Sequence, residues 1–442
     1  MSTTPPPAPA APSGPRPPRR NQARDIHEAH RVATPLELLF DLVFVVAIAQ
    51  SAAQLDHGVL AHHTAQAVGG YLLAFGAIWW AWINYTWFAS AYDDDSTAFR
   101  LLTLLQMGGV LLLATGIPGM FEGQFLAPVL GYVLMRLALG LQWLRAGQGD
   151  PARRRTCRRY ATGIALVQAG WVLFLLAAES GVLSGAGLVA AILALWLCEL
   201  AVPPWAEGAG ATPWHAHHIA ERYGLLVIIL LGEGILGATN AVSAMWQAHG
   251  WSLDLALVGF AGTLLVFSLW WMYFLVPSAD ALHHHRERAF VWGYGHFAVF
   301  AALAAVGAGL EVVADVLKNA QDAAATHGAA AQGVAEAAHG AVEGAHEAAH
   351  GVSALYAIGM VALAEGIYVL ALWALYRWVS RARHHDGWLT LVCLACIAAA
   401  PAAVALGLPL PWGLLLLSLG PIIAVAYHEH GRVHCAESFA VH

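Results

Sequence analysis

The sequence predicts an all-α fold: a polytopic bundle of about twelve transmembrane helices. Of its 442 residues, 59% are hydrophobic and only 11% are charged, against roughly 25% charged residues in an ordinary soluble domain. Long uncharged runs recur along the chain, and about 20 apolar residues are enough for one helix to cross a bilayer. Composition and run length together exclude a soluble globular enzyme or binding domain.

Twelve apolar segments are long enough to span the membrane. They lie near residues 36–55, 67–90, 99–120, 125–144, 160–179, 182–203, 219–240, 254–276, 290–312, 353–378, 388–407 and 410–427. Only "GLPLP" separates the last two segments, so eleven spans is the alternative count.

Arginine is distributed on one side of this twelve-span arrangement. Arginines precede the first span, crowd the loop "PARRRTCRR" at 151–159, and recur at loops and span ends such as Arg222 and Arg377. Lys318 is the basic residue on the opposite side. Because loops rich in arginine stay in the cytoplasm, we expect both termini to be cytoplasmic.

The expected organisation is two six-helix halves between two tails. Residues 1–33 are rich in proline and arginine and predict a disordered cytoplasmic tail. Residues 34–205 form the first half, 206–430 the second half, and 431–442 a cytoplasmic tail. The stretches "ELLFDLVFVVAIAQ" and "ERYGLLVIILLGEG" open the two halves and resemble each other, so a parallel duplication is a hypothesis.

An alanine- and histidine-rich insert, residues 318–352, interrupts the second half on the expected external side. In a helix, one face would carry polar side chains, namely Gln332, His339, Glu343, His346 and His350. Two interpretations remain: a solvated surface helix, which we favour because the glycines of the segment weaken it, and a Glu/His metal site.

Ionisable residues inside the spans are the main functional signal. An ion near mid-membrane costs about 3 kcal/mol, so these side chains must pair, face the bundle interior or line a wet cavity. The candidate intramembrane polar site comprises Glu37, Asp41, Arg136, His218, Glu221, Arg222, Glu233, His296 and Glu311. It has two interpretations, an ion or proton path and a set of structural ion pairs.

The sequence also suggests partners within this set. Arg136 lies deep in a span and needs an acid, for which Asp41, Glu199 and Glu233 are the candidates. If the two halves repeat, the first and seventh spans lie side by side. Arg222 is then the expected partner of Asp41 or Glu37.

Cysteine and histidine give weaker signals. The five cysteines are scattered, and Cys393 and Cys396 lie in an apolar span, so we expect neither a disulfide framework nor redox chemistry. Histidines cluster at 215–218, 283–285, 384–385 and 428–434. Convergence of these clusters could bind zinc, but interfacial histidines are the favoured interpretation, and no metal or cofactor is assigned.

Several of these segments resemble one family. "TPLELLFDLVFVVAIAQ" (34–50) resembles the first signature of the bacterial low temperature requirement protein A (LtrA) family, and "HIAERYGLLVIILLGEGIL" (218–236) resembles its second. "WWMYF" (270–274) and "GHFAVFAALAAVGAGLE" (295–311) are similar to its later segments, so the resemblance covers about Ala33 to Tyr427. It implies a multi-pass bacterial inner-membrane protein with a role in growth at low temperature, and it implies no mechanism.

Three functions remain open at this stage. The favoured one is passage of a small ion, proton or polar solute through the interior acids, without enzymatic activity. The alternatives are a membrane-embedded enzyme acting on lipid, for which no DDxxD-like, HExxH or GxSxG motif is present, and a sensor or scaffold. The expected partners are the lipid bilayer and a small ion or solute, with no nucleic acid; the oligomeric state is not predicted.

Overall fold

The computed structural model describes residues 23–26, 28, 31–331, 352–380 and 387–440, and within these ranges the regular structure is helical throughout. The first six long helices are α1 (Pro35–Leu60), α2 (Thr64–Tyr92), α3 (Thr97–Phe121), α4 (Leu126–Gly149), α5 (Arg154–Glu179) and α6 (Gly185–Glu207). The remaining long helices are α7 (Ala216–His249), α8 (Leu253–Phe274), α10 (Ala289–Ala331), α12 (Ala354–Ser380), α13 (Gly387–Ala405) and α14 (Leu410–Ala440), with the short α9 (Ser278–His284) after α8.

These helices confirm the predicted helical membrane bundle. Eleven of the described helical segments are long and apolar enough to cross a membrane. The 34-residue α7 coincides with the seventh expected segment. With these eleven segments it brings the number of long helices in the described ranges to twelve. The "GLPLP" stretch ends α13 at Ala405 and lets α14 begin at Leu410, so the last two segments are separate helices.

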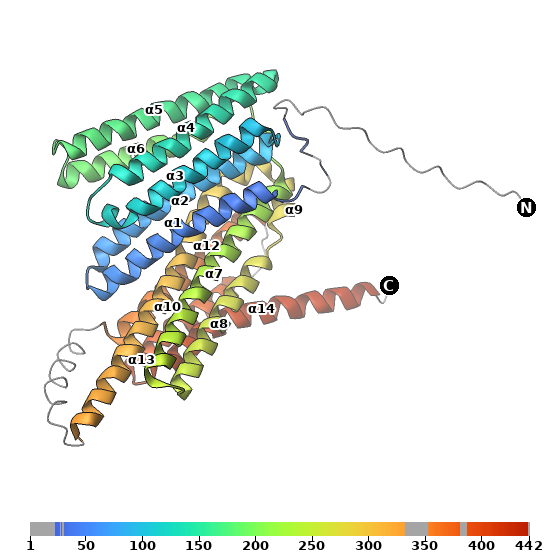
Figure 1. Ribbon diagram of the computed structural model, residues 1–442. Helices are drawn as coiled ribbons and strands as arrows, with labels where there is room; N and C mark the ends of the chain where they lie inside the picture. The colour runs from blue at the N-terminus through green and yellow to red at the C-terminus, as the bar shows by residue number, and fades with distance from the viewer. Residues whose placement is uncertain (1–22, 27, 29–30, 332–351, 381–386, 441–442) are drawn as a thin grey trace, which may run out of the picture.

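The helices of the two expected halves occupy different parts of the bundle (Figure 1). In the first, α1 packs on α3, α3 on α4, α4 on α5 and α5 on α6. In the second, α7 packs on α10, and α10, α12, α13 and α14 follow in the same order. The first, third, fourth, fifth and sixth long helices of each part therefore form the same chain of contacts, while a duplication itself stays a hypothesis.

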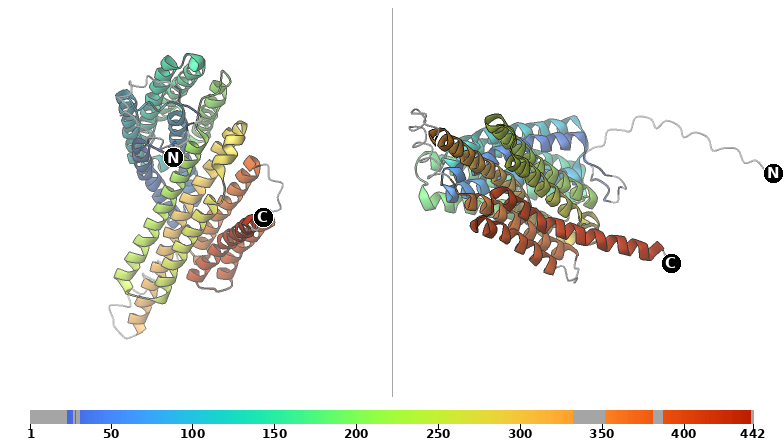
Figure 2. Two further views of the ribbon diagram at one scale, coloured as in Figure 1. Left: turned by 90° about the vertical axis from the view of Figure 1, so that its right-hand side faces the viewer. Right: turned by 90° about the horizontal axis from the view of Figure 1, so that it is seen from below.

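The two parts meet along α1 and α2 on one side and α7 and α10 on the other. The described chain begins and ends at the same end of the bundle (Figures 1 and 2). We call this the arginine-rich end, because the first turns of α5, with Arg154, Arg155, Arg158 and Arg159, lie there, as do Arg286 and Arg288 before α10.

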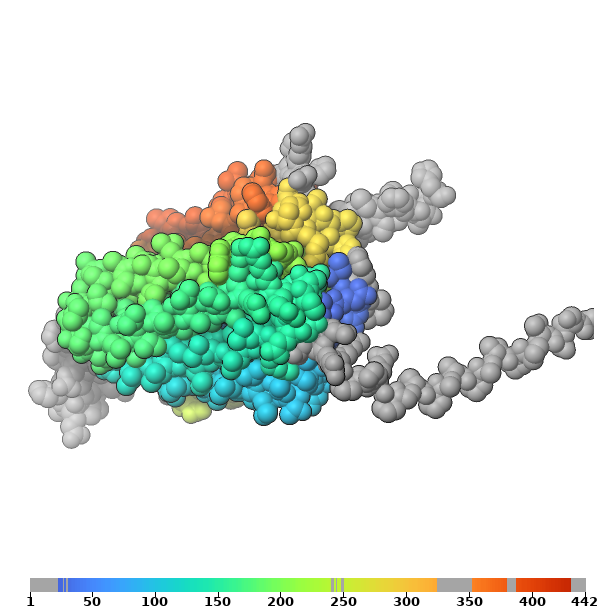
Figure 3. Space-filling model, turned by 90° about the horizontal axis from the view of Figure 1, so that it is seen from above, coloured from blue at the N-terminus to red at the C-terminus, as the bar shows by residue number. Residues whose placement is uncertain are grey.

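Burial separates the interior helices from those that face lipid. In the most apolar stretch of α10, 78% of the residues are buried. In the corresponding stretch of α6, only 11% are buried. Figure 3 shows the face that α4 to α6 largely form. The exposed leucines of α5 and α6 include Leu173, Leu176, Leu193 and Leu197. An exposed leucine surface on a membrane helix is the surface that contacts hydrocarbon tails.

Three expected boundaries change. We expected a disordered tail over residues 1–33. Near the end of this range, Arg31 is instead buried, and its Nη2 donates to Ala89 O at 2.8 Å. The final helix does not stop near residue 430 but continues to Ala440. Likewise, α10 continues from the ninth span through residues 318–331 of the insert, and residues 332–351, with all five polar positions named above, lie outside the described residues.

Gly131 provides a stability test of the closest helix crossing in the first half. A Cβ at this position would lie 2.5 Å from Gly109 O and from Leu113 N, both backbone atoms of α3. We expect Gly131→Ala to push α4 away from α3 and to destabilise the protein by about 1–3 kcal/mol. Gly108→Ala, which meets nothing within 4 Å, is the matched control. Equal thermal stability of both variants in detergent would contradict the close approach.

Candidate functional site

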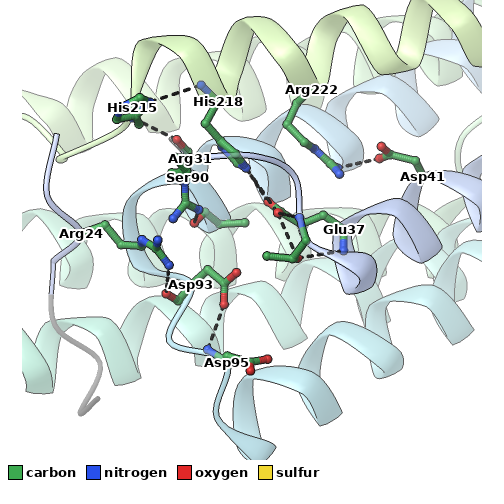
Figure 4. Close-up of polar contacts among 12 residues, drawn as sticks. Arg24, Arg31, Glu37, Asp41, Ser90, Asp93, Asp95, His215, His218 and Arg222 are labelled. Carbon is green, nitrogen blue, oxygen red and sulfur yellow. Dashed lines mark hydrogen bonds and ion pairs between the residues drawn. The ribbon is translucent and has the colours of Figure 1, made fainter. Parts of the chain in front are cut away.

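A buried ion pair joins α1 to α7 near the arginine-rich end. Arg222 Nη2 donates to Asp41 Oδ1 at 2.6 Å, and both side chains are almost fully buried. The same Asp41 oxygen accepts a hydrogen bond of 2.7 Å from the indole N–H of Trp82 on α2. Figure 4 shows Arg222 and Asp41 pointing toward each other from facing helices. The predicted contact of the first and seventh spans is confirmed, and Asp41 is the partner of Arg222.

Glu37 makes a second connection between the same two helices. Its Oε2 accepts from Thr34 N at 2.8 Å, and Thr34 Oγ1 accepts from Glu37 N, which is a capping box at the start of α1. Its Oε1 lies 3.0 Å from His218 Nε2 on α7. Both acids at the entrance of α1 therefore have protein partners, so neither faces lipid.

Glu221 belongs to the same region but contacts another group. It is half-buried in the first turns of α7 and accepts a hydrogen bond from the backbone of Ala33. Adjacent residues on a helix point about 100° apart, so Arg222 reaches the interior acid while Glu221 holds the segment that precedes α1.

Asp93, in the loop after α2, extends this cluster beyond the membrane helices. Its backbone oxygen accepts from Arg24 Nη1 at 3.4 Å, and its Oδ1 accepts from Asp95 N at 2.9 Å (Figure 4). Burial, and next the nearby negative charge of Glu37, raise the pKa of Asp93 from 3.8 to about 6.

The raised pKa of Asp93 predicts a pH dependence of stability. A carboxyl group with a raised folded-state pKa stabilises the protein while it is protonated, below about pH 4, and this contribution is lost as the pH rises through about 6. We therefore expect the wild type to lose roughly 2–3 kcal/mol from this group between pH 4 and pH 7, and Asp93→Asn to lack that loss. Denaturation profiles of the two proteins that run parallel over this range would contradict the assignment.

A second buried ion pair lies inside the first half. Arg136 of α4 donates from Nη2 to Glu199 Oε2 of α6 at 2.9 Å, and both side chains are almost fully buried. Glu199 also accepts from Trp80 Nε1 at 3.0 Å and from Gln168 Nε2 at 2.8 Å. Of the three acids open to Arg136, the structure selects Glu199, which receives donors from α2, α4 and α5.

A cavity of about 350 Å³ lies beside this network, between α2, α4, α5 and α6 of the first part and the start of α10. Seven aromatic residues line it: Trp80, Trp87, Trp143, Tyr160, Trp214, Phe290 and Tyr294. Trp143 and Tyr160 stack with centroids 4.0 Å apart and planes 3° from parallel. Trp80 lies twelve residues before the end of α2, about 18 Å deeper than that end at 1.5 Å per residue, so the cavity reaches from the arginine-rich end to the Glu199 network.

The mouth of this aromatic cavity carries two acids, Glu207 and Glu287, and one base, Arg286. Glu207, at the end of α6, accepts from Tyr160 Oη at 3.0 Å and from Thr212 Oγ1 at 2.7 Å. Arg286 places its guanidinium carbon 3.8 Å from the centre of the Trp214 ring and donates to Trp214 O at 2.8 Å. A ligand in the cavity would meet aromatic faces and both signs of charge.

The other predicted site residues lie elsewhere. Glu233 of α7 lies close enough to Glu311 of α10 for the two charges to interact, and Glu311 shares a side-chain hydrogen bond with Asp56 of α1. His296 of α10 is hydrogen-bonded through Nε2 to Tyr273 Oη at 3.2 Å. The nine candidate residues thus divide into separate clusters and do not form one continuous path.

Histidines from two of the four predicted clusters approach one another: the rings of His217 and His283 lie 6.3 Å apart. Even so, no group of three or more histidine, cysteine, aspartate or glutamate side chains in the described part of the chain could hold a metal ion. Residues 384–385 lie outside the described ranges, as do the side chains of 431–434.

The prediction from sequence omitted the tryptophans. Trp80 and Trp82 each donate to a buried carboxylate, and Trp80 and Trp87 line the cavity. The available signal was the run "IWWAWINYTW" in the second span, since a buried indole N–H requires an acceptor.

Comparison with known proteins identifies the family. The model of the bacterial low temperature requirement A protein (LtrA) family matches residues 32–421. An uncharacterized protein of Rhizobium meliloti is 29% identical over 285 residues, which cover 60% of this chain and 65% of that protein. No solved structure matches. Because the family model spans most of the sequence, this multi-pass bacterial membrane protein belongs to the LtrA family.

Proposed function

We propose that the protein is a transporter of a small organic solute, and not an enzyme, and that the aromatic cavity is its solute site. The single observation that carries this proposal is the position of the cavity. It opens at the arginine-rich end, lies between helices of both parts of the bundle, and ends at Trp80, which is bonded to the Glu199–Arg136 pair. Solute sites of transporters built from two repeats lie at the interface between those repeats.

The lining favours an organic cation or a zwitterion. Ring faces attract alkylated ammonium groups, and Glu207 adds a negative charge at the mouth. Arg286 offers a donor pair to a carboxylate or similar anion. A cavity of about 350 Å³ is at the small end of the range for ligand sites, which supports a compact solute.

The interior ion pairs support a moving interface. Asp41–Arg222 and Glu37–His218 connect α1 to α7 across the two parts of the bundle. A buried pair is no more stabilising than good apolar packing, so we infer that these pairs define one arrangement of the two parts that a transport cycle can exchange for another.

Binding of choline and glycine betaine, with glucose as a neutral control, tests the solute site. The rings that line it provide intrinsic tryptophan fluorescence, and proteoliposome uptake gives the second readout. We expect saturable responses to one or both ammonium compounds and at least tenfold weaker binding in Glu207→Gln. Glu179→Gln, an exposed acid at the far end of α5, is the matched control. A response to glucose alone, or unchanged binding in Glu207→Gln, would overturn the assignment.

We further propose that the arginine-rich end and both termini are cytoplasmic, in the inner membrane. The positive-inside rule supports this orientation. Reporter fusions at Gly123, Gly250 and Gly328 should all report the external side, and a cytoplasmic signal at Gly250 would reverse it.

The family name supports a role in growth at low temperature. A deletion strain should grow normally when warm and slowly when cold, and the Glu207→Gln gene should fail to restore cold growth. Full restoration by that variant would separate the cold phenotype from the solute site.

A further inference from the structure

Glu365 differs from every paired acid described above. It lies in the middle of α12, its side chain has no exposed surface, and neither carboxylate oxygen has a hydrogen-bond partner among the described residues. Burying an unpaired carboxylate is among the most costly arrangements in a membrane protein. The position therefore requires an explanation beyond packing.

The first part of the bundle also has a charged residue near the middle of its fourth long helix. Arg136 is the eleventh residue of α4, the fourth long helix of the first part, and it is paired with Glu199. Glu365 is the twelfth residue of α12, the fourth long helix of the second part. The middle of the fourth long helix thus carries a paired charge in one part and, in the other part, an acid without a counter-ion among the described residues.

A second cavity leads toward Glu365. It has a volume of about 310 Å³ and lies between α8, α12, α13 and α14, with Val369, Leu372 and Tyr376 of α12 in its wall. These residues follow Glu365 by four, seven and eleven positions, so all four share one face of the helix. Val369 lies about 6 Å along the axis from Glu365, which places the acid one turn below the cavity.

Among the residues that the structure describes, no basic side chain forms an ion pair with Glu365. The carboxyl group of Glu365 is buried, and the titratable side chains near it are Tyr368 of α12 and Cys393 of α13. Tyr273 of α8 lies close to Tyr368. His428 of α14 lies in the wall of the cavity. His296 of α10 is hydrogen-bonded to Tyr273. A carboxyl group that is buried without partners is less costly to hold as the neutral acid than as the ion, and the neutral acid carries a proton.

We propose that Glu365 is a proton-binding site, loaded and emptied through the cavity between α8, α12, α13 and α14. Proton release leaves a carboxylate that must gain water or a cation, so release requires this cavity to deepen by one helix turn. The occupant is a proton and not a metal ion, because no group of three or more histidine, cysteine, aspartate or glutamate side chains in the described ranges could hold a metal. This site is independent of the aromatic cavity, and the failure of either proposal leaves the other standing.

Dicyclohexylcarbodiimide labelling of the full-length protein in detergent tests the proposal. This apolar reagent adds to a protonated carboxyl group in apolar surroundings, and mass spectrometry of the resulting acylurea locates the modified residue. We expect labelling of Glu365 at pH 6, a rate at least tenfold lower at pH 9, and no labelling of the paired Glu37. Glu365→Gln should lose the label, whereas Glu179→Gln should keep it.

Three results would overturn the proposal: no label at Glu365, a labelling rate independent of pH, or protection by sodium or potassium ions, which would indicate a cation site. The wild-type experiment decides the question even if Glu365→Gln fails to accumulate.

Discussion

Asp41→Asn should lower the free energy of unfolding by about 3–5 kcal/mol, because it leaves the Arg222 guanidinium buried without a counter-charge. The asparagine keeps the shape and one oxygen for Trp82 and Arg222, so the loss measures charge and not packing. Arg222→Gln should lose a similar amount, since Asp41 is then the unpaired ion. Denaturant unfolding in mixed micelles gives both values.

The double variant Asp41→Asn/Arg222→Gln provides the control. With both charges removed, neither ion is buried alone, and we expect most of the lost stability to return. The coupling free energy from the double-mutant cycle isolates the pair. A double variant as unstable as the sum of the single variants would show that the two side chains act separately. Transport that recovers with stability would show that the pair is structural, and transport that stays absent would assign it to the cycle.

Glu199→Gln should be at least as damaging, with a loss of about 3–5 kcal/mol from the stranded Arg136 charge. Glu199 also accepts from Trp80 and Gln168, and a glutamine has one acceptor oxygen where the carboxylate has two. We expect the Trp80 side chain to change position at the end of the aromatic cavity, seen as a shift in tryptophan emission and weaker ammonium binding.

Two comparisons make the Glu199 result interpretable. Glu179→Gln changes an exposed acid and should alter neither stability nor emission. Arg136→Gln should reproduce the stability loss while Glu199 still accepts from Trp80, so its emission should stay closer to the wild type. Equal emission shifts in both variants would contradict the bond from Trp80 to Glu199 as the connection between ion pair and cavity.

Much of the fold could be predicted because its signals are local. Each span needs a run of apolar residues as long as the membrane is thick, and such runs are visible without knowing their neighbours. The capping box of Thr34 and Glu37 is local in the same way. Boundaries were less certain, as α10 shows: alanine forms helices equally well in water, so nothing in the sequence ended that helix at the membrane surface.

The sequence by itself determined that the protein spans a membrane many times and that its interior acids need partners. It predicted Arg222 as the partner of an acid of the first span only on the hypothesis that the two halves repeat. The tertiary structure alone decided which partner each charge receives, because Glu199 and Arg136 are 63 residues apart and meet only when α4 and α6 pack. It also decided the aromatic cavity and the isolation of Glu365. A cavity and an absent counter-charge depend on how helices pack against one another. The spacing of residues along one helix does not specify that packing.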